Sequence, residues 1–342
     1  MLINLYAFKC HMLQSERRLQ KIGSSVLMSL PAEWIKTLGL KKGDILSIEN
    51  NEDNSITIFP ASIRNIQNKE IAIHLIDLSH DKLINQIYGA YLLGYDTIKI
   101  VGKTQIDFED REVIKKAMRN LVGLEIVDED GLNITIQFLL DSRSLNISKL
   151  LKQMSSIVNG THRDIVNAMK TGETNIDLLV RGRDDEVNRQ YFLIVRLIRT
   201  ALMDRRLATS LDLSNIDILD YRIASNHLEN AGDLISKLSS LLAGSFDKIK
   251  YEKIIEANNL ILQMQEKSIS GFITKDTEKS SQVVTFFNKF NAISNFIKNE
   301  YIKLEGNYEA VLKIINIVYT MDEIAKCWVD IADLIKPTYS IR

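Results

Sequence analysis

The chain has 342 residues and a mass of 39.0 kDa, which exceeds the usual size of one domain and predicts two or three. Its 45% hydrophobic and 25% charged residues exclude a mostly disordered or fibrous protein. Only 3 prolines and 15 glycines interrupt the chain, so we expect long helices. The 43 Lys and Arg residues balance 44 Asp and Glu residues, so nucleic acid or a membrane surface can be bound only through a local patch.

The two cysteines, Cys10 and Cys327, match no spaced metal or redox motif, which favours a reducing compartment. No apolar run reaches the roughly 18 residues of a membrane span, and residues 1–11 lack the pattern of a signal peptide. We therefore expect a cytoplasmic protein. Recognisable structure begins at Met12, which indicates a disordered extension or a misassigned start for residues 1–11.

Residues 12–60 have the pattern of short strands around one short helix. Apolar and small residues alternate over 26–30, as in a half-buried strand. Pro31 fits the first position of a helix and Gly39 its left-handed end. Two more strands are predicted, at 45–49 and 55–59. Because so short a segment makes a poor core alone, we expect it to dimerise.

The order of these features from Arg17 to Asp44 resembles the AbrB/SpoVT swapped-hairpin domain of transition-state regulators and antitoxins. In that family two chains interleave hairpins into one barrel, and basic residues of the first strand and its loop face DNA. The resemblance implies a homodimer with DNA contacts at Arg17, Arg18, Lys21, Ser24 and Ser25. Residues 12–60 hold six basic and six acidic residues, whereas phosphate contacts normally come with a basic excess. A module that only dimerises is therefore the alternative.

Residues 63–141 are predicted to form a small α/β domain. Its strands are expected at 70–76, 97–101, 124–127 and 133–138, and its helices at 81–93 and 108–121. Asp81 and Asp107 are placed as helix caps. No Gly-rich phosphate loop follows a strand, so a nucleotide site is not indicated. We expect this domain to act as a spacer rather than a sensor.

Residues 145–342 are dominated by helical periodicity and divide into two repeats, at about 145–243 and 247–336. Six helices are expected, at 145–171, 184–208, 213–243, 247–270, 276–304 and 308–336. In the second of these a stripe is predicted to face the bundle, formed by Val187, Tyr191, Ile194, Ile198 and Leu202. The fold class is therefore multi-domain and mainly α.

Two pairs of oxygen-bearing side chains lie beside the apolar stripes of this region. Asp184 and Asn188 are four residues apart, as are Glu229 and Asp233, so each pair shares a helix face with about 6 Å between its members. Such oxygens on adjacent helices suit a hard or borderline divalent cation. A solvated or salt-bridged helix face explains them equally.

The segments 183–192 and 222–233, which contain these pairs, resemble the helix signatures of PhoU phosphate-signalling proteins. That family has two tandem three-helix bundles with acidic motifs that bind metal clusters. The resemblance implies a divalent or iron-type metal in the first bundle, held by Asp184, Asn188, Glu229 and Asp233. Asn188 replaces a usual Asp, and Lys326 follows Asp322 in the last helix, where a cation opposes metal. His227 is expected to be a surface or packing residue.

An AbrB-like domain followed by PhoU-like bundles is the layout of archaeal phosphate uptake regulators. The resemblance implies a non-enzymatic, DNA-binding regulator of phosphate uptake or signalling. The alternative is an adaptor that docks on a phosphate transporter or signalling protein without binding DNA. A metal-dependent hydrolase built on Asp184, Glu229 and Asp233 is disfavoured, because no nucleophile and base accompany these residues in sequence.

Overall fold

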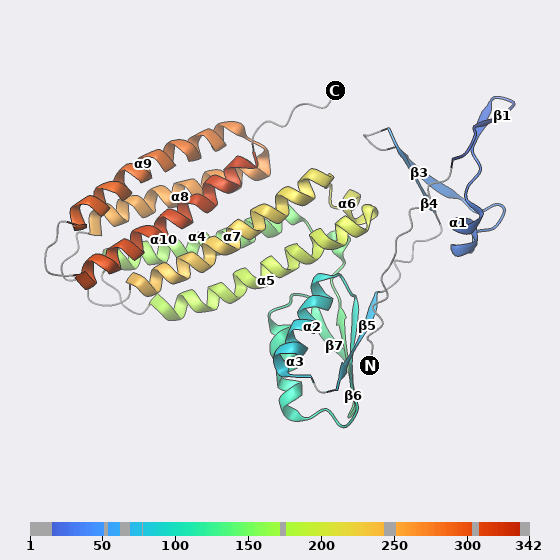
Figure 1. The fold of residues 1–342 in the computed structure, drawn as a ribbon, viewed down its shortest axis with the longest axis horizontal. Helices are drawn as coiled ribbons and strands as arrows, with labels where there is room; N and C mark the ends of the chain where they lie inside the picture. The colour runs from blue at the N-terminus through green and yellow to red at the C-terminus, as the bar shows by residue number, and fades with distance from the viewer. Residues whose placement is uncertain are drawn as a thin grey trace. The chain divides into compact units, whose positions relative to one another are not determined.

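The computed structural model describes residues 16–50, 54–61, 69–76, 78–171, 176–242, 251–302 and 308–335 (Figure 1). The chain forms two compact units, Met1–Asn68 and Lys69–Arg342. The segments predicted as separate domains, 63–141 and 145–342, thus fall mainly in the second unit. No helix in the described ranges is long and apolar enough to cross a membrane.

The first unit contains two antiparallel hairpins and a short helix. Strand β1 (Gln20–Ile22) pairs with β2 (Ser25–Leu27), and β3 (Leu46–Asn50) pairs with β4 (Ile56–Pro60). Helix α1 (Ala32–Thr37) lies between the hairpins. Gly39 ends it in the left-handed region, as predicted, at a φ of 62°. Pro31 is the N-cap rather than the first helical residue, and the strand predicted over 26–30 ends at Leu27.

The first unit buries almost none of its apolar side chains. Among its described residues only Pro60 is fully buried. Eight large apolar side chains are exposed: Leu19, Ile22, Val26, Leu27, Met28, Ile45, Ile48 and Ile56. The described part of the unit thus buries little apolar surface in a single copy, and removing the exposed surface from water would favour association.

The second unit begins with a four-stranded sheet in the order β5-β6-β8-β7. Its strands are β5 (Glu70–Leu75), β6 (Thr97–Gly102), β7 (Leu124–Glu129) and β8 (Asn133–Phe138), and only β5 and β6 pair in parallel. The helices are α2 (His80–Leu92) and α3 (Phe108–Arg119). The predicted elements are confirmed. Asp107 caps α3 by accepting from the Asp110 N–H at 2.8 Å, but the Asp81 cap is wrong, because Ser79 holds that position and Asp81 lies in the first turn.

After a short 3-10 turn (Ser142–Ser144), the rest of the unit is helical. The helices are α4 (Ile147–Thr171), α5 (Ile176–Met203), α6 (Arg205–Ser210), α7 (Asn215–Leu242), α8 (Tyr251–Thr274), α9 (Thr277–Ile302) and α10 (Tyr308–Asp333). Helices α4, α5 and α7 form a first bundle, and α8, α9 and α10 a second (Figure 1). The six long helices confirm the predicted two sets of three.

The prediction for α5 is wrong at both ends. The helix begins at Ile176 and stops at Met203, because Asp204 accepts a hydrogen bond from the Arg206 N–H at 3.0 Å and starts the separate helix α6. Leu202, predicted to face the bundle, is 65% exposed. The neighbouring Ala201 is only 2% exposed, so at this level one side of α5 is buried while the side that carries Leu202 faces solvent.

Buried polar pairs join the two bundles. Between α4 and α8, His162 Nε2 lies 2.8 Å from Asn258 Oδ1, and the Gln265 amide donates to the Ser155 carbonyl at 3.0 Å. All four side chains are buried. Because Asn258 offers an oxygen, the imidazole donates from Nε2 and is neutral. Burial lowers the pKa of His162 to about 4.

Arg196 attaches the sheet and its helices to the first bundle. Its guanidinium, only 2% exposed, donates to the carbonyls of Tyr91 at 2.7 Å and Tyr95 at 3.0 Å and to Asp96 Oδ1 at 3.2 Å. It also lies 3.9 Å from the centre of the Phe138 ring. These donors satisfy carbonyls at the end of α2, so one residue of α5 fixes where the α/β part packs.

We expect His162→Gln to reduce the dependence of stability on pH. The folded-state pKa of about 4 lies below the usual 6.5, so acid favours the unfolded chain. The wild type should lose on the order of 3 kcal/mol more unfolding free energy than the variant between pH 7 and 4. Urea unfolding measures this, with exposed His74→Gln as control. Equal pH slopes for wild type and His162→Gln would contradict the assignment.

Arg196→Met should destabilise the second unit by about 3 kcal/mol, because it removes three hydrogen bonds, one to Asp96 and two to backbone carbonyls. Thermal and urea unfolding of the full chain measure the loss. Arg199→Met, an exposed position on the same helix, is the matched control and should change stability by less than about 0.5 kcal/mol. Equal effects of the two substitutions would show that the Arg196 contacts contribute nothing specific.

Candidate functional site

The predicted DNA-contacting residues lie on the first hairpin and just before it. Lys21 is on β1, Ser24 is in the turn and Ser25 begins β2, while Arg17 and Arg18 precede β1. All five side chains are exposed. The turn depends on Gly23, whose φ of 62° is one that glycine adopts without strain. The hairpin therefore presents cationic and hydroxyl groups together at the surface.

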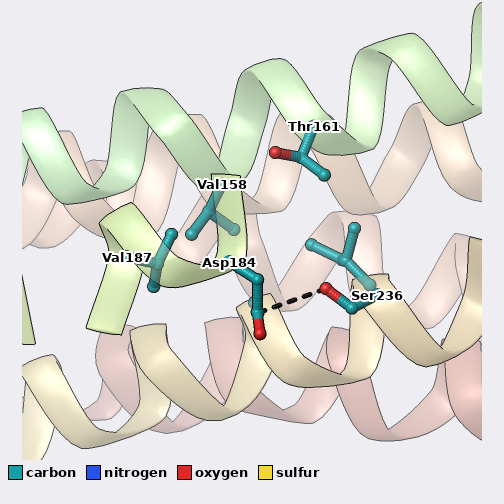
Figure 2. Close-up of a pocket in the computed structure, with 7 residues that line it drawn as sticks. Val158, Thr161, Asp184, Val187 and Ser236 are labelled. Atoms are coloured by element: carbon teal, nitrogen blue, oxygen red, sulfur yellow. Dashed lines mark hydrogen bonds between the residues drawn. The ribbon is translucent and has the colours of Figure 1, made fainter. Parts of the chain in front are cut away.

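The predicted metal ligands lie on two antiparallel helices of the first bundle. Asp184 is on α5, and its Oδ1 accepts a hydrogen bond from Ser236 Oγ on α7 at 3.2 Å (Figure 2). Beside them is a cavity of about 10 Å³, room for about one water molecule. It is lined by Val158, Thr161, Asp184, Val187, Gly232, Ile235 and Ser236. A side chain at Gly232 would place its Cβ 3.3 Å from Val187, so glycine permits this close helix approach.

The three carboxyl groups form one electrostatic group. Partial burial raises the pKa of each of the three carboxyl groups, Asp184, Glu229 and Asp233, above the usual value. The charges of Asp233 and Asp184 raise the pKa of Glu229 further, while Arg222 lowers it, and the charge of Asp184 also raises the pKa of Asp233. The Ser236 hydrogen bond acts in the opposite direction on Asp184. In the described ranges none of the three forms an ion pair with Lys or Arg.

Within the residues that the structure describes, no three His, Cys, Asp or Glu side chains come together around a common metal position. Asn188 is half-buried on α5 and offers only a neutral amide oxygen. The structure thus brings the predicted carboxylates near one another without forming a coordination sphere.

Two carboxylates of the second bundle pair with lysines of the same bundle. Asp322 on α10 pairs with Lys298 on α9 at 2.5 Å and accepts from Ser294 Oγ at 2.8 Å. Lys326, predicted to oppose metal, pairs instead with Glu323 at 2.7 Å. The cation that faces Asp322 was not found from the sequence, because Lys298 is 24 residues away and only the packing of α9 on α10 reveals it.

His227 lies on α7 where this helix packs against α10. Its Nδ1 is 3.5 Å from Asp330 Oδ2, and its side chain is 27% exposed. Close by, Asn230 donates to the buried Cys327 sulfur at 3.3 Å. His227 is thus a packing residue of the contact between the bundles and not part of the carboxylate group.

Comparison with known proteins assigns two parts of the chain. Residues 19–65 match the family of the antidote-toxin recognition protein MazE, a bacterial antitoxin, and residues 151–242 match the PhoU domain. Residues 19–65 are thus similar to a MazE-type domain, and residues 151–242 are similar to a PhoU domain. The MazE-type match contains both hairpins and α1, and the PhoU match contains the first bundle from α4 to α7.

Two solved structures match part of the chain. The phosphate transport system regulatory protein PhoU from Streptococcus pneumoniae is 15% identical with a TM-score of 0.47, over 55% of this chain and 91% of that one. PhoU from Pseudomonas aeruginosa is 18% identical with a TM-score of 0.48, over 55% of this chain and 93% of that one. No curated protein matches the chain.

We expect Asp233→Asn to lower the pKa of Glu229, because it removes a like charge. Ser236→Ala should raise the pKa of Asp184 further, because it removes a hydrogen bond to the ionised carboxylate. Carboxyl-carbon NMR titration of the full chain measures both shifts. Ser240→Ala, one turn along α7, is the control and should leave Asp184 unchanged. A Glu229 pKa that does not move in Asp233→Asn would show that these groups do not interact.

Proposed function

We propose that this protein is a non-enzymatic regulator of phosphate uptake or phosphate signalling that binds DNA. The MazE-type domain contacts DNA, and the helical bundles sense a signal or bind a partner protein. The observation that carries the proposal is the presence of both domains in one chain, with an exposed basic hairpin in the first. No step of the proposal needs a metal.

The DNA-binding form in this proposal is a homodimer. Large apolar side chains of both hairpins are exposed in a single chain, and a second copy provides a matching surface to cover them. Pairing two copies also doubles the number of cations at one surface. That matters because the charge of residues 12–60 is balanced, so affinity depends on where Arg17, Arg18 and Lys21 lie.

The balanced charge supports a second candidate function. In it the MazE-type domain only dimerises, and the bundles act as an adaptor on a phosphate transporter or signalling protein. Six basic and six acidic residues in 12–60 favour this version. Deleting residues 1–60 should then lower the oligomer size, measured by light scattering, and leave partner binding intact.

The test of DNA binding is fluorescence anisotropy with labelled DNA from upstream of the protein's own gene, against scrambled DNA, over a salt series. The wild type should bind the upstream DNA more tightly than the scrambled DNA, and it should bind more weakly as the salt concentration rises. Lys21→Ala should weaken DNA binding about fivefold to tenfold. It should also reduce the slope of log affinity against log salt concentration by about one unit for each lost phosphate contact.

The matched control is Lys152→Ala, which removes an exposed lysine of α4 outside the MazE-type domain. It should leave both affinity and salt dependence unchanged. If the wild-type protein, shown to be folded and dimeric, binds neither DNA near physiological salt, that result favours the adaptor function over DNA binding. If it binds and Lys21→Ala has no effect, the hairpin is not the contact surface.

A further inference from the structure

Helix α10 carries large apolar side chains on the side that faces away from the bundles. The helix packs against α7, α8 and α9 (Figure 1). Four of its side chains lie outside these contacts, and we call them the α10 seam. They are Tyr308, Leu312, Ile315 and Tyr319, which are 82%, 62%, 37% and 57% exposed.

The seam has the spacing of a helix that packs along another helix. Its members follow one another at intervals of four, three and four residues, which is the a and d pattern of a coiled coil. The core of the bundle uses a separate set of α10 residues, because Ile314, Val318 and Met321 are fully buried. Single exposed apolar residues are ordinary on a protein surface, whereas a row over three turns of one helix marks a contact.

The order of side chains in the seam matches a second copy of the same helix. Read in either direction, the seam is aromatic, aliphatic, aliphatic and aromatic, and its spacing is also the same both ways. A two-fold axis that passes between residues 313 and 314 would set Tyr308 of each copy opposite Tyr319 of the other. The same axis would set Leu312 opposite Ile315, as a self-complementary contact requires.

The charges beside the seam are compatible with this pairing. Antiparallel α10 helices would place the exposed Glu309 of one copy beside the exposed Asn316 of the other, so no like charges are opposed there. Farther along the same face, Lys326 pairs with Glu323 of its own chain at 2.7 Å. Recognition at the seam is therefore apolar and needs no charged partner.

We propose that two copies of this chain associate through antiparallel pairing of their α10 seams. The seam extends about 16 Å along the helix, so the contact is small beside the roughly 1,200 Å² at the low end of stable interfaces. It therefore adds to the self-association proposed for the hairpins rather than replacing it. This inference goes beyond the proposed function, which assigns self-association to the first unit alone.

Cross-linking of single cysteines in the full chain tests both the contact and its direction. The background is Cys10→Ser, and Cys327 stays because it is buried. In an antiparallel pair the two Ile315 positions lie about 5 Å apart along the helix axis, whereas the two Lys326 positions lie about 38 Å apart. A short bismaleimide should therefore give covalent dimer with Ile315→Cys on denaturing gels. Lys326→Cys, exposed on the same face, should give at least tenfold less.

Loss of the seam should prevent the cross-link. Tyr308→Ser with Tyr319→Ser, added to Ile315→Cys, should lower the yield of covalent dimer at least fivefold. The matched control is Val284→Ser with Phe296→Ser, which changes two apolar residues of α9 that are 44% and 51% exposed. It should leave the yield unchanged. Circular dichroism and melting curves establish that each variant is folded.

The proposal is overturned if Ile315→Cys gives no covalent dimer, which would leave the seam to a helix of a different protein. It is also overturned if Lys326→Cys cross-links equally well, because the contact is then parallel or unspecific. A third contrary result is an unchanged yield in Tyr308→Ser, Tyr319→Ser.

DNA anisotropy separates this inference from the proposed function. Cross-linking through α10 in a protein that binds no DNA would remove the DNA-binding part of the proposed function and support the α10 contact. DNA binding by a protein whose α10 seam does not cross-link would overturn the contact and leave the proposed function in place.

Discussion

The arrangement of the second unit depends on the buried guanidinium of Arg196. A buried arginine needs hydrogen-bond acceptors, and here Nη1 donates to the backbone carbonyls of Tyr91 and Tyr95 while Nη2 donates to Asp96. Next to it, a Cβ at Gly94 would lie 2.5 Å from Thr200 Oγ1, so no side chain fits between α2 and α5 there. The sheet part is therefore packed firmly on α5, the helix that also carries Asp184.

The contact between the bundles is specified in a similar way. Ser155 and His162 on α4 meet Gln265 and Asn258 on α8, so the two contacts are seven residues apart on both helices. Apolar surfaces alone would allow antiparallel helices to slide by a turn. A slip would leave buried amide and imidazole groups unpaired, at a cost of about 1–3 kcal/mol for each group. The polar pairs thus select one register.

Local patterns were enough to predict most of the elements. Gly39 ended α1, Asp107 began α3, and apolar periodicity gave the six long helices and every strand of the sheet. What could not be predicted depends on contacts between distant segments. Leu202 matched the apolar stripe, yet its side chain is 65% exposed, and the Ser236 partner of Asp184 is 52 residues away. Side-chain spacing within one helix contains no information about either.

Contacts between distant segments also explain why the carboxylates of the two bundles differ in charge neutralisation despite similar sequence patterns. Asp322 finds Lys298 on the neighbouring helix, so its charge is neutralised within the chain. Asp184, Glu229 and Asp233 repel one another and hold their protons more tightly than isolated carboxyl groups. An external cationic group would relieve this repulsion, just as a second copy would cover the apolar hairpins of the first unit.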